Sequence, residues 1–216
     1  MFAPVPPVPP GQLRQISVRT LAHYRRFAAG YRDGTWDHDV SQNIEALLGA
    51  IGGAPPYRIL DLGCGPGRDL VAFRARGHAA TGLDGCPEFV RMARAASGCE
   101  VWLQDLLALQ LPAKRFDGVF ANAVLFHVPS QALPAVMSDL WATLRPDGVL
   151  LSSNPRGQNE EGWADGRYAC FHDVASWRRA VASAGFCLLD HYYRPPGKPR
   201  RQQPWLVTVW RKRSPA

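Results

Sequence analysis

The chain has 216 residues, of which 46% are hydrophobic and 20% are charged. This length and composition suit a single α/β domain with one buried core. No stretch approaches the roughly 20 apolar residues that a membrane-spanning helix needs. The five cysteines lack C-x-x-C spacing, which argues against a disulfide framework and against a zinc site. We therefore expect a cytoplasmic protein without a metal ion or a membrane span.

The formal net charge of +7 is concentrated near the C-terminus. The segment 191–216 holds seven Lys and Arg residues and no acid, while basic and acidic residues balance in the rest of the chain. One interpretation is a solvated basic flank. The other is a patch that binds RNA or an anionic substrate, because such a field attracts phosphate and carboxylate groups.

The N-terminal quarter of the chain is predicted to be helical after a short lead-in. Five prolines and no basic residue lie within residues 1–10, so we expect a disordered, proline-rich lead-in over 1–11 that is neither a secretory signal nor a transit peptide. Apolar residues at helical spacing predict helices over 12–29 and 39–51. A polar and aromatic linker is expected at 30–38.

Strands alternate with helices from residue 57 onward. The expected strands are 58–62, 79–83, 100–103, 118–121 and 149–153, and the expected helices are 69–76, 87–96, 133–144 and 176–184. This alternation predicts right-handed crossovers and a parallel sheet. Two further strands, 186–193 and 204–210, have no helix between them and must pair antiparallel. The segment 154–173 is expected to be a long loop that covers the site.

The run Asp-Leu-Gly-Cys-Gly-Pro-Gly at residues 61–67 is the most informative part of the chain. Its alternate glycines allow positive φ angles and close approach of a ligand, and the next helix points its amide dipoles at the turn. A dinucleotide site would show G-x-G-x-x-G, but Arg68 stands where the third glycine would be. The carboxylate of Asp61 would also repel a pyrophosphate, whereas it would suit a cationic ligand. NAD binding is therefore disfavoured.

This run resembles motif I of the class I S-adenosylmethionine-dependent methyltransferases, and the antiparallel ending of the sheet resembles theirs as well. The resemblance implies a Rossmann-like three-layer sandwich with a seven-stranded, mostly parallel sheet in the order 3-2-1-4-5-7-6, the last strand antiparallel. It implies S-adenosyl-L-methionine as cofactor and S-adenosyl-L-homocysteine as product. Residues 57–213 would form the methyltransferase core, and residues 12–56 would form an N-terminal helical cover on the substrate side.

The carboxyl ends of the first four strands are expected to hold the cofactor, because ligands of open α/β sheets bind where the strand order reverses. Asp84, at the end of the second strand, would accept both ribose hydroxyls; its structural alternative is a helix N-cap. By resemblance, Asp105 would accept the adenine amine with Leu106 on the ring, unless Asp105 is a surface acid. The expected cofactor contacts are Asp61, Gly63, Cys64, Gly65, Gly67, Asp84, Gly85, Gln104, Asp105, Leu106, Asn122 and Ala123.

Methyl transfer requires the protein to align a nucleophile with the sulfonium methyl group. A general base helps only where that nucleophile carries a proton. Candidate bases are His38, His127 and His172, since imidazole titrates near neutral pH. His127 is equally well explained as a ring that ties down its loop. Candidate substrate contacts are Tyr24, Tyr31, Trp36, Asn154, Arg156 and Tyr168. Among them, Arg156 would clamp a carboxylate.

The sequence lacks the N-P-P-Y tetrapeptide of enzymes that methylate amino groups of DNA or glutamine amides of proteins, and it has no added nucleic-acid module. We therefore expect methyl transfer to N, O or S of a small polar or heteroaromatic metabolite, amino-acid-derived metabolites included. The alternatives are an RNA or protein methyltransferase that uses the basic C-terminal strip, and a non-catalytic domain that only binds the cofactor. The protein is expected to be a monomer or a homodimer.

Overall fold

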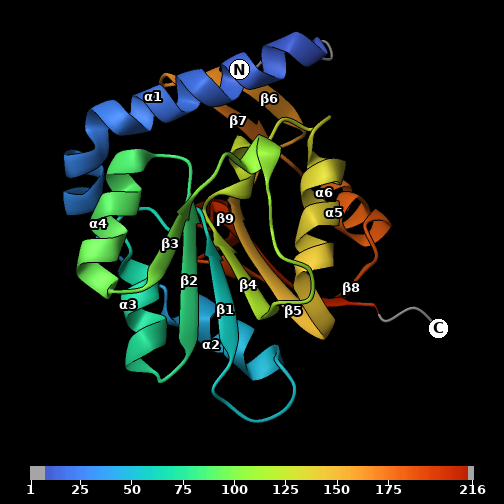
Figure 1. The fold of residues 1–216 in the computed structure, drawn as a ribbon. Coiled ribbons are helices and arrows are strands. Elements are labelled where there is room, and N and C mark those ends of the chain that lie inside the picture. Colours follow the sequence, from blue (N-terminus) through green and yellow to red (C-terminus); the bar gives the residue numbers. More distant parts are fainter. Residues whose placement is uncertain (1–7, 214–216) are drawn as a thin grey trace.

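The computed structural model describes residues 8–213 and contains a seven-stranded sheet in the order β3-β2-β1-β4-β5-β9-β8. The strands are β1 Arg58–Leu62, β2 Ala79–Asp84, β3 Glu100–Leu103, β4 Phe116–Asn122, β5 Leu144–Pro155, β8 Phe186–Arg194 and β9 Trp205–Lys212. β9 runs antiparallel to both of its neighbours, and the other pairs are parallel (Figure 1). The predicted Rossmann-like sheet, with its reversed final strand, is confirmed.

Helices cover both faces of this sheet (Figure 1). They are α2 Ser41–Ala50, α3 Arg68–Ala75 and α4 Pro87–Ser97 on one face, and α5 Leu133–Thr143 and α6 Val174–Ser183 on the other. β1 shows how the sheet is buried from both sides. Ile59 packs into the core cluster of α2 and α3, whereas its neighbours Leu60 and Leu62 pack into the cluster of α5 and α6. Such a continuous apolar strand is typical of a parallel sheet with two covered faces.

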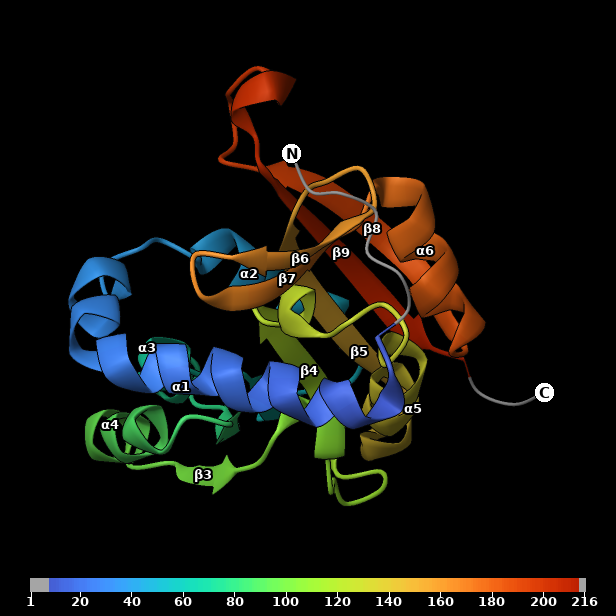
Figure 2. The same ribbon diagram turned by 90° about the horizontal axis from the view of Figure 1, so that it is seen from above.

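The N-terminal helix α1, Pro10–Thr35, crosses the carboxyl ends of the strands (Figures 1 and 2). It bends at Phe27, whose φ of −111° and ψ of 15° are not helical. The predicted linker at 30–38 is therefore mostly wrong, because the helix continues to Thr35. The predicted lead-in is wrong at Pro10, which begins the helix at a position that suits proline. Its first seven residues, 1–7, lie outside the described residues.

The segment predicted as a loop over 154–173 contains an antiparallel hairpin of β6 Glu160–Ala164 and β7 Arg167–Phe171. Its turn residues Asp165 and Gly166 both have positive φ, 49° and 80°, the backbone that an Asp-Gly pair favours in tight hairpins. The hairpin lies beside α1 (Figure 2), and the Tyr168 N–H donates to Thr20 Oγ1 at 3.0 Å. We call α1 and this hairpin together the cover.

The remaining predicted elements differ from the structure mainly at their ends. The strand expected at 149–153 begins earlier, at Leu144, as β5, which pairs with β4 through a shift in register between Phe116 and Gly118. Short 3-10 helices follow several strands: η1 Leu106–Ala108, η2 Leu125–His127 and η3 Arg200–Gln202. Among the described residues, no helix combines the length and the apolar character that crossing a bilayer requires.

Candidate active site

The glycine loop, residues 63–67, connects β1 to α3, and its three glycines meet different surroundings. Gly63 has a φ of 66°, and a Cβ there would lie 2.2 Å from Val124 Cγ2. At Gly67, with a φ of 95°, a Cβ would lie 2.7 Å from the Cα of Ala93. Packing therefore requires these two glycines. Gly65 has a φ of 52°, and the only atom within 4 Å of its added Cβ is Tyr31 Cε1, at 3.9 Å. Gly65 is the glycine that opens onto a cavity.

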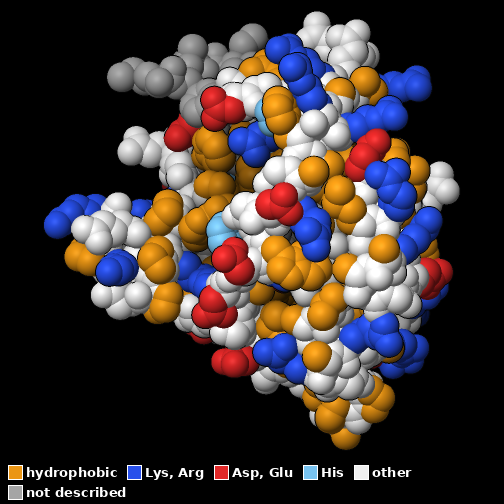
Figure 3. Space-filling model, turned by 90° about the vertical axis from the view of Figure 1, so that its left-hand side faces the viewer, with side chains coloured by type: hydrophobic (Ala, Val, Ile, Leu, Met, Phe, Trp, Pro, Cys, Tyr) orange, Lys and Arg blue, Asp and Glu red, His pale blue; other side chains and the backbone are white. Residues whose placement is uncertain are grey.

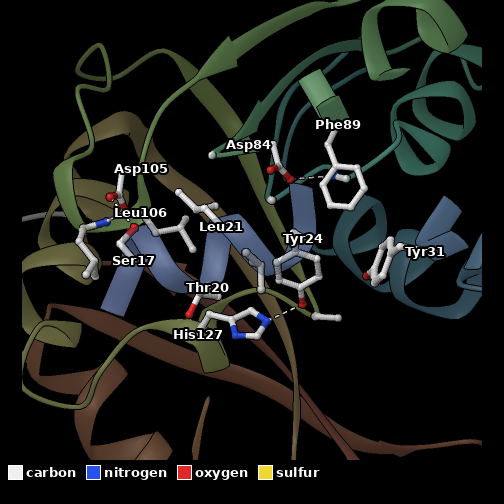
Figure 4. Close-up of a pocket in the computed structure, with 16 residues that line it drawn as sticks. Ser17, Thr20, Leu21, Tyr24, Tyr31, Asp84, Phe89, Asp105, Leu106 and His127 are labelled. Atoms are coloured by element: carbon white, nitrogen blue, oxygen red, sulfur yellow. Dashed lines mark hydrogen bonds between the residues drawn. The ribbon is translucent and has the colours of Figure 1, made fainter. Parts of the chain in front are cut away.

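Asp84 ties this loop to the end of β2. Its carboxylate accepts the N–H of Gly65 at 2.9 Å (Figure 4) and also the N–H of Cys86 at 2.8 Å. Each carboxylate oxygen has capacity for a second hydrogen bond, so both can also accept hydroxyl groups. Burial raises the pKa of Asp84 to about 6. The structural alternative, a helix N-cap, is wrong: the N-cap of α4 is Cys86, and no side chain caps this helix. Asp84 instead anchors the glycine loop and borders the cavity.

A cavity of about 690 Å³, partly open to solvent, lies between the strand ends and α1. The predicted cofactor residues on its wall are Gly63, Gly65, Asp84, Gly85, Asp105, Leu106 and Ala123. α1 supplies Ser17, Thr20, Leu21, Tyr24 and Tyr31 to the opposite wall (Figure 4). Residues from four strand ends therefore converge on one space, as expected of a ligand site at the point where the strand order reverses.

Asp105 already has a partner from the cover. Its Oδ2 accepts the hydroxyl of Ser17 at 2.5 Å, and its Oδ1 accepts the N–H of Leu107 at 2.9 Å (Figure 4). The second of these bonds caps η1. The Ser17 contact links α1 directly to the wall that the sequence assigned to adenine.

Five predicted cofactor residues do not line this cavity. Cys64 and Asn122 border a second cavity, described below. Gly67 serves helix packing, and the side chain of Gln104 bonds the backbone of Gln110. Asp61 is buried at the end of β1, and its Oδ2 has no hydrogen-bond partner among the described residues. Burial, followed by the charge of Asp69, raises the pKa of Asp61 well above its usual range. The predicted contacts of these residues with a cofactor stay predictions.

The second cavity adjoins the first and spans about 1670 Å³, including space open to solvent. The two cavities share the wall residues Tyr24, Tyr31, Gly63, Gly65 and Ala123. Charged groups on the second wall include Arg68 and Asp69, which form a bidentate ion pair at 2.7 and 2.9 Å. Arg167 of the hairpin and Arg194 of β8 are also on this wall. The wall of the second cavity thus carries charged groups of both signs among apolar and aromatic residues.

Tyr24 and His127 form a half-buried pair at the first cavity (Figure 4). The Tyr24 hydroxyl lies 2.7 Å from His127 Nε2, and His127 Nδ1 lies 2.6 Å from the carbonyl oxygen of Tyr168. A carbonyl can only accept, so Nδ1 carries the proton and Nε2 accepts from Tyr24. Burial lowers the pKa of His127 to about 4 and raises that of Tyr24 to about 12. Both side chains are therefore neutral at pH 7, and both imidazole nitrogens have protein partners.

The other candidate bases lie in different places. His38 is exposed on the wall of the second cavity. His172 lines neither cavity; its Nε2 lies 3.3 Å from Cys170 Sγ, and its ring packs against Trp177. A role in proton transfer at the cavities is therefore not supported for His172.

Four candidate substrate residues also lie away from both cavities. Arg156 donates to the backbone oxygens of Gln203 and Arg200, and Asn154 is buried within β5. Trp36 packs under the guanidinium of Arg32. Tyr168 is only 2% exposed because it points from β7 into the packing with α1. Side chains alternate along a strand, so its neighbour Arg167 is the one that reaches the cavity. These four predictions of substrate contact are not supported.

Sequence reasoning named Tyr24 and Tyr31 but missed the other residues of α1 on the wall of the first cavity. Residues 17, 20, 21, 24 and 31 line this cavity and repeat at helical spacing. This signal was present, but Ser17 and Thr20 interrupt the apolar pattern. The hydrophobic periodicity also included Phe27, which is 50% exposed.

Comparisons with known proteins agree with this geometry. A family model described as a methyltransferase domain matches residues 59–148. The trans-aconitate 2-methyltransferase of Azoarcus sp. (strain BH72) is 38% identical over 104 residues, which are 47% of this chain and 40% of that protein. The malonyl-[acyl-carrier protein] O-methyltransferase of Serratia marcescens is 34% identical over 110 residues, 50% of this chain and 42% of that protein. The chain thus covers less than half the length of these two relatives.

Solved structures share the fold over nearly the whole chain. The 1,6-didemethyltoxoflavin-N1-methyltransferase of Burkholderia thailandensis, with 1,6-didemethyltoxoflavin and S-adenosylhomocysteine bound, has a TM-score of 0.79 at 23% identity and covers 99% of this chain and 95% of its own. The [4+2]-cyclase SpnF has a TM-score of 0.72 at 17% identity over 99% of this chain and 100% of its own. A shared fold therefore does not by itself determine the reaction.

The strand order, the glycine loop and the cavity above Gly65 define the class I methyltransferase fold. Residues 59–148 match the model of a methyltransferase domain, and the chain has the fold of the S-adenosylmethionine-dependent methyltransferases to which it is similar.

Proposed function

We propose that this protein transfers a methyl group from S-adenosylmethionine to a nucleophilic N, O or S atom of a small polar or heteroaromatic metabolite, amino-acid-derived ones included. One observation carries this proposal. The cavity bordered by the predicted cofactor residues shares the wall at Gly65 and Tyr24 with a second cavity, whose wall carries charged and aromatic side chains. Transfer of a group requires that the methyl donor and the methyl acceptor lie close together, and two adjoining cavities with a common wall would allow this.

The residues of the first cavity fit the cofactor. The open space above Gly65 lets a ligand approach the backbone, and the carboxylate of Asp84 has acceptor capacity left for two ribose hydroxyls. Asp105 and Leu106 would hold the adenine amine and ring. When bound, the cofactor supplies an activated methyl group on its sulfonium.

The contribution of the protein is positioning and exclusion of water. α1 closes the first cavity from the side opposite the strands, which keeps solvent from the reacting groups. His127 holds the Tyr24 hydroxyl in one orientation at the wall that the two cavities share. Because its pKa is lowered to about 4 by burial, His127 acts here as a positioning residue rather than as a base at neutral pH.

The small-molecule reading is supported over the RNA or protein alternative by the location of the basic residues. Two of the seven C-terminal cations have structural roles: Lys212 is buried and donates to the Leu144 carbonyl, and Arg211 donates to the Ala50 carbonyl. The β8–β9 connection does project from the body (Figure 2). On the side of the molecule seen in Figure 3, however, basic and acidic side chains are interspersed rather than gathered into a single basic field.

Calorimetric titration with S-adenosylmethionine and S-adenosylhomocysteine tests the first half of the proposal. We expect both to bind at micromolar concentration, and NAD and ATP, as controls, not to bind. Transfer of labelled methyl groups to a panel of small acceptors, and to RNA, tests the second half. Transfer to RNA that falls steeply with salt concentration would overturn the small-molecule proposal in favour of the alternative.

A further inference from the structure

Arg167 is a cation on the wall of the second cavity without a carboxylate partner. None of the described acidic side chains forms an ion pair with it. The nearby wall residue Arg68 differs, because Asp69 neutralises it through two hydrogen bonds. Charged groups in a partly enclosed wall are costly to desolvate unless they are paired, so an unpaired guanidinium at this place calls for an explanation.

The contacts of Arg167 leave one edge of its guanidinium unused. Nη1 donates to the Tyr24 hydroxyl at 3.3 Å, and the guanidinium carbon lies 5.6 Å from the centroid of the Tyr24 ring. Nε is buried, and no described group accepts a hydrogen bond from it. The Nε side of a guanidinium, together with Nη2, is a fork that matches the two oxygens of a carboxylate. The Tyr24 contacts hold the side chain in place, while the hydrogen-bonding capacity of this edge is not used by any described group.

We infer that Arg167 recognises a carboxylate on the methyl acceptor, so that the substrate class of this site is small carboxylic acids. The inference rests on the proposed function and specifies its substrate. Because Arg167 contacts Tyr24, which borders both cavities, an acid held by Arg167 lies next to the wall shared with the cofactor cavity.

The rest of the wall favours a single carboxylate over a phosphate. The acid Asp39 borders the same cavity and would repel a dianion more strongly than a monoanion. Arg194, the other cation on this wall without an ion pair among the described residues, already donates to the backbone oxygen of Asp39. The rings of Phe126 and Trp205 also border the cavity and suit a flat organic body attached to the acid.

The test uses acids paired with their primary amides on protein saturated with S-adenosylhomocysteine. Suitable pairs are nicotinate with nicotinamide, indole-3-carboxylate with its amide, and imidazole-4-carboxylate with its amide. Each pair has the same ring and differs only in the charge of the group that Arg167 would hold. We expect calorimetry to show that at least one acid binds at least tenfold more tightly than its amide. Equal affinity within every pair, or no binding by any acid, would overturn the inference.

Variants assign the preference to Arg167. In Arg167→Gln, the preferred acid should lose at least tenfold in affinity while its amide is unaffected, and Arg167→Lys should recover part of the loss because charge without the fork is retained. Arg178→Gln removes an exposed cation from α6 and should behave as the parent protein. An acid that binds Arg167→Gln as tightly as the parent would contradict the inference. Affinity for S-adenosylhomocysteine, measured in each variant, shows whether that variant is folded and still binds the cofactor product. Failure of the inference can therefore be distinguished from failure of the proposed function.

Discussion

The glycine loop and the cover border the same adjoining cavities, but different kinds of contact hold them in place. The loop is fixed by backbone geometry and by Asp84, which lies 19 residues along the chain from Gly65. The cover is fixed by side-chain bonds between distant segments, such as Thr20 with Tyr168, which are 148 residues apart. The first region therefore depends on a short motif, whereas the second depends on packing that only the complete fold provides.

The largest effect is expected from Gly65→Val, which breaks the loop without touching the cover. The valine would fill the space in front of the backbone and would force a β-branched residue to a φ of 52°. We expect affinity for S-adenosylhomocysteine to fall by at least ~100-fold, about 2.8 kcal/mol, in calorimetry. Gly53→Val is the matched control, because Gly53 also has a positive φ and open space around it. Parental affinity in a folded Gly65→Val protein would refute the assignment of the cavity.

Asp84→Ala should have the next largest effect. It removes the carboxylate that anchors the loop and that is assigned to the ribose hydroxyls. The loss of charged hydrogen bonds should weaken cofactor binding by about 1.5–3 kcal/mol. Circular dichroism should confirm that the variant is folded. The cofactor affinity of Asp84→Asn should lie between that of the parent and that of Asp84→Ala, because the amide keeps one acceptor oxygen. Unchanged affinity would mean that the ribose lies elsewhere.

The raised pKa of Asp84 predicts that affinity for S-adenosylhomocysteine depends on pH. This dependence would come from the residue that anchors the glycine loop and not from the cover. The ionised carboxylate accepts hydroxyl groups, and it becomes protonated as the pH falls through about 6. Affinity for S-adenosylhomocysteine should therefore be greatest above pH 7 and should decrease by up to about tenfold per pH unit below pH 6. The Asp84→Asn variant should show no such step between pH 5 and 7.5. The same step in that variant would assign the titration to another group.

Tyr24→Phe tests the cover. It leaves His127 Nε2 buried without a donor, so the free energy of unfolding should fall by about 1–3 kcal/mol, measured in urea. Turnover should fall as well, while cofactor affinity stays close to that of the parent. Tyr57→Phe is the control, since its hydroxyl bonds the Gly53 carbonyl at an exposed site. A large loss of cofactor affinity in Tyr24→Phe would show that the cover and the loop act as one unit.

Ser17→Ala should have the smallest effect and the opposite sign for binding. It removes the 2.5 Å bond to Asp105 and frees a carboxylate oxygen on the wall assigned to adenine. We expect affinity for S-adenosylhomocysteine to rise by less than about tenfold, since one neutral-donor hydrogen bond contributes about 1 kcal/mol. Weaker binding would show instead that Ser17 helps to hold the cofactor. Ser183→Ala, on the far side of the molecule at α6, is the control.

The predictions from sequence were accurate where a local pattern has one structural meaning. Alternating elements produced the correct parallel sheet, and the missing helix before residue 204 correctly placed β8 and β9 antiparallel. They were inaccurate where tertiary contacts extend an element. α1 continues through the expected linker, where Tyr31 packs on Phe89 of α4. The Asp165-Gly166 turn signal was present in the loop that proved to be a hairpin.

The sequence by itself determined the sheet, the glycine loop and the acids at the strand ends, because these follow from periodicity and from backbone angles that few residues accept. Only the tertiary structure decided that Arg167, and not Tyr168, borders the second cavity. It also decided that His127 is neutral, with its proton on Nδ1. These outcomes depend on contacts between segments far apart in the chain, such as Tyr24 with His127, which are 103 residues apart, and His127 with Tyr168, which are 41 residues apart. No local pattern of residues encodes such contacts.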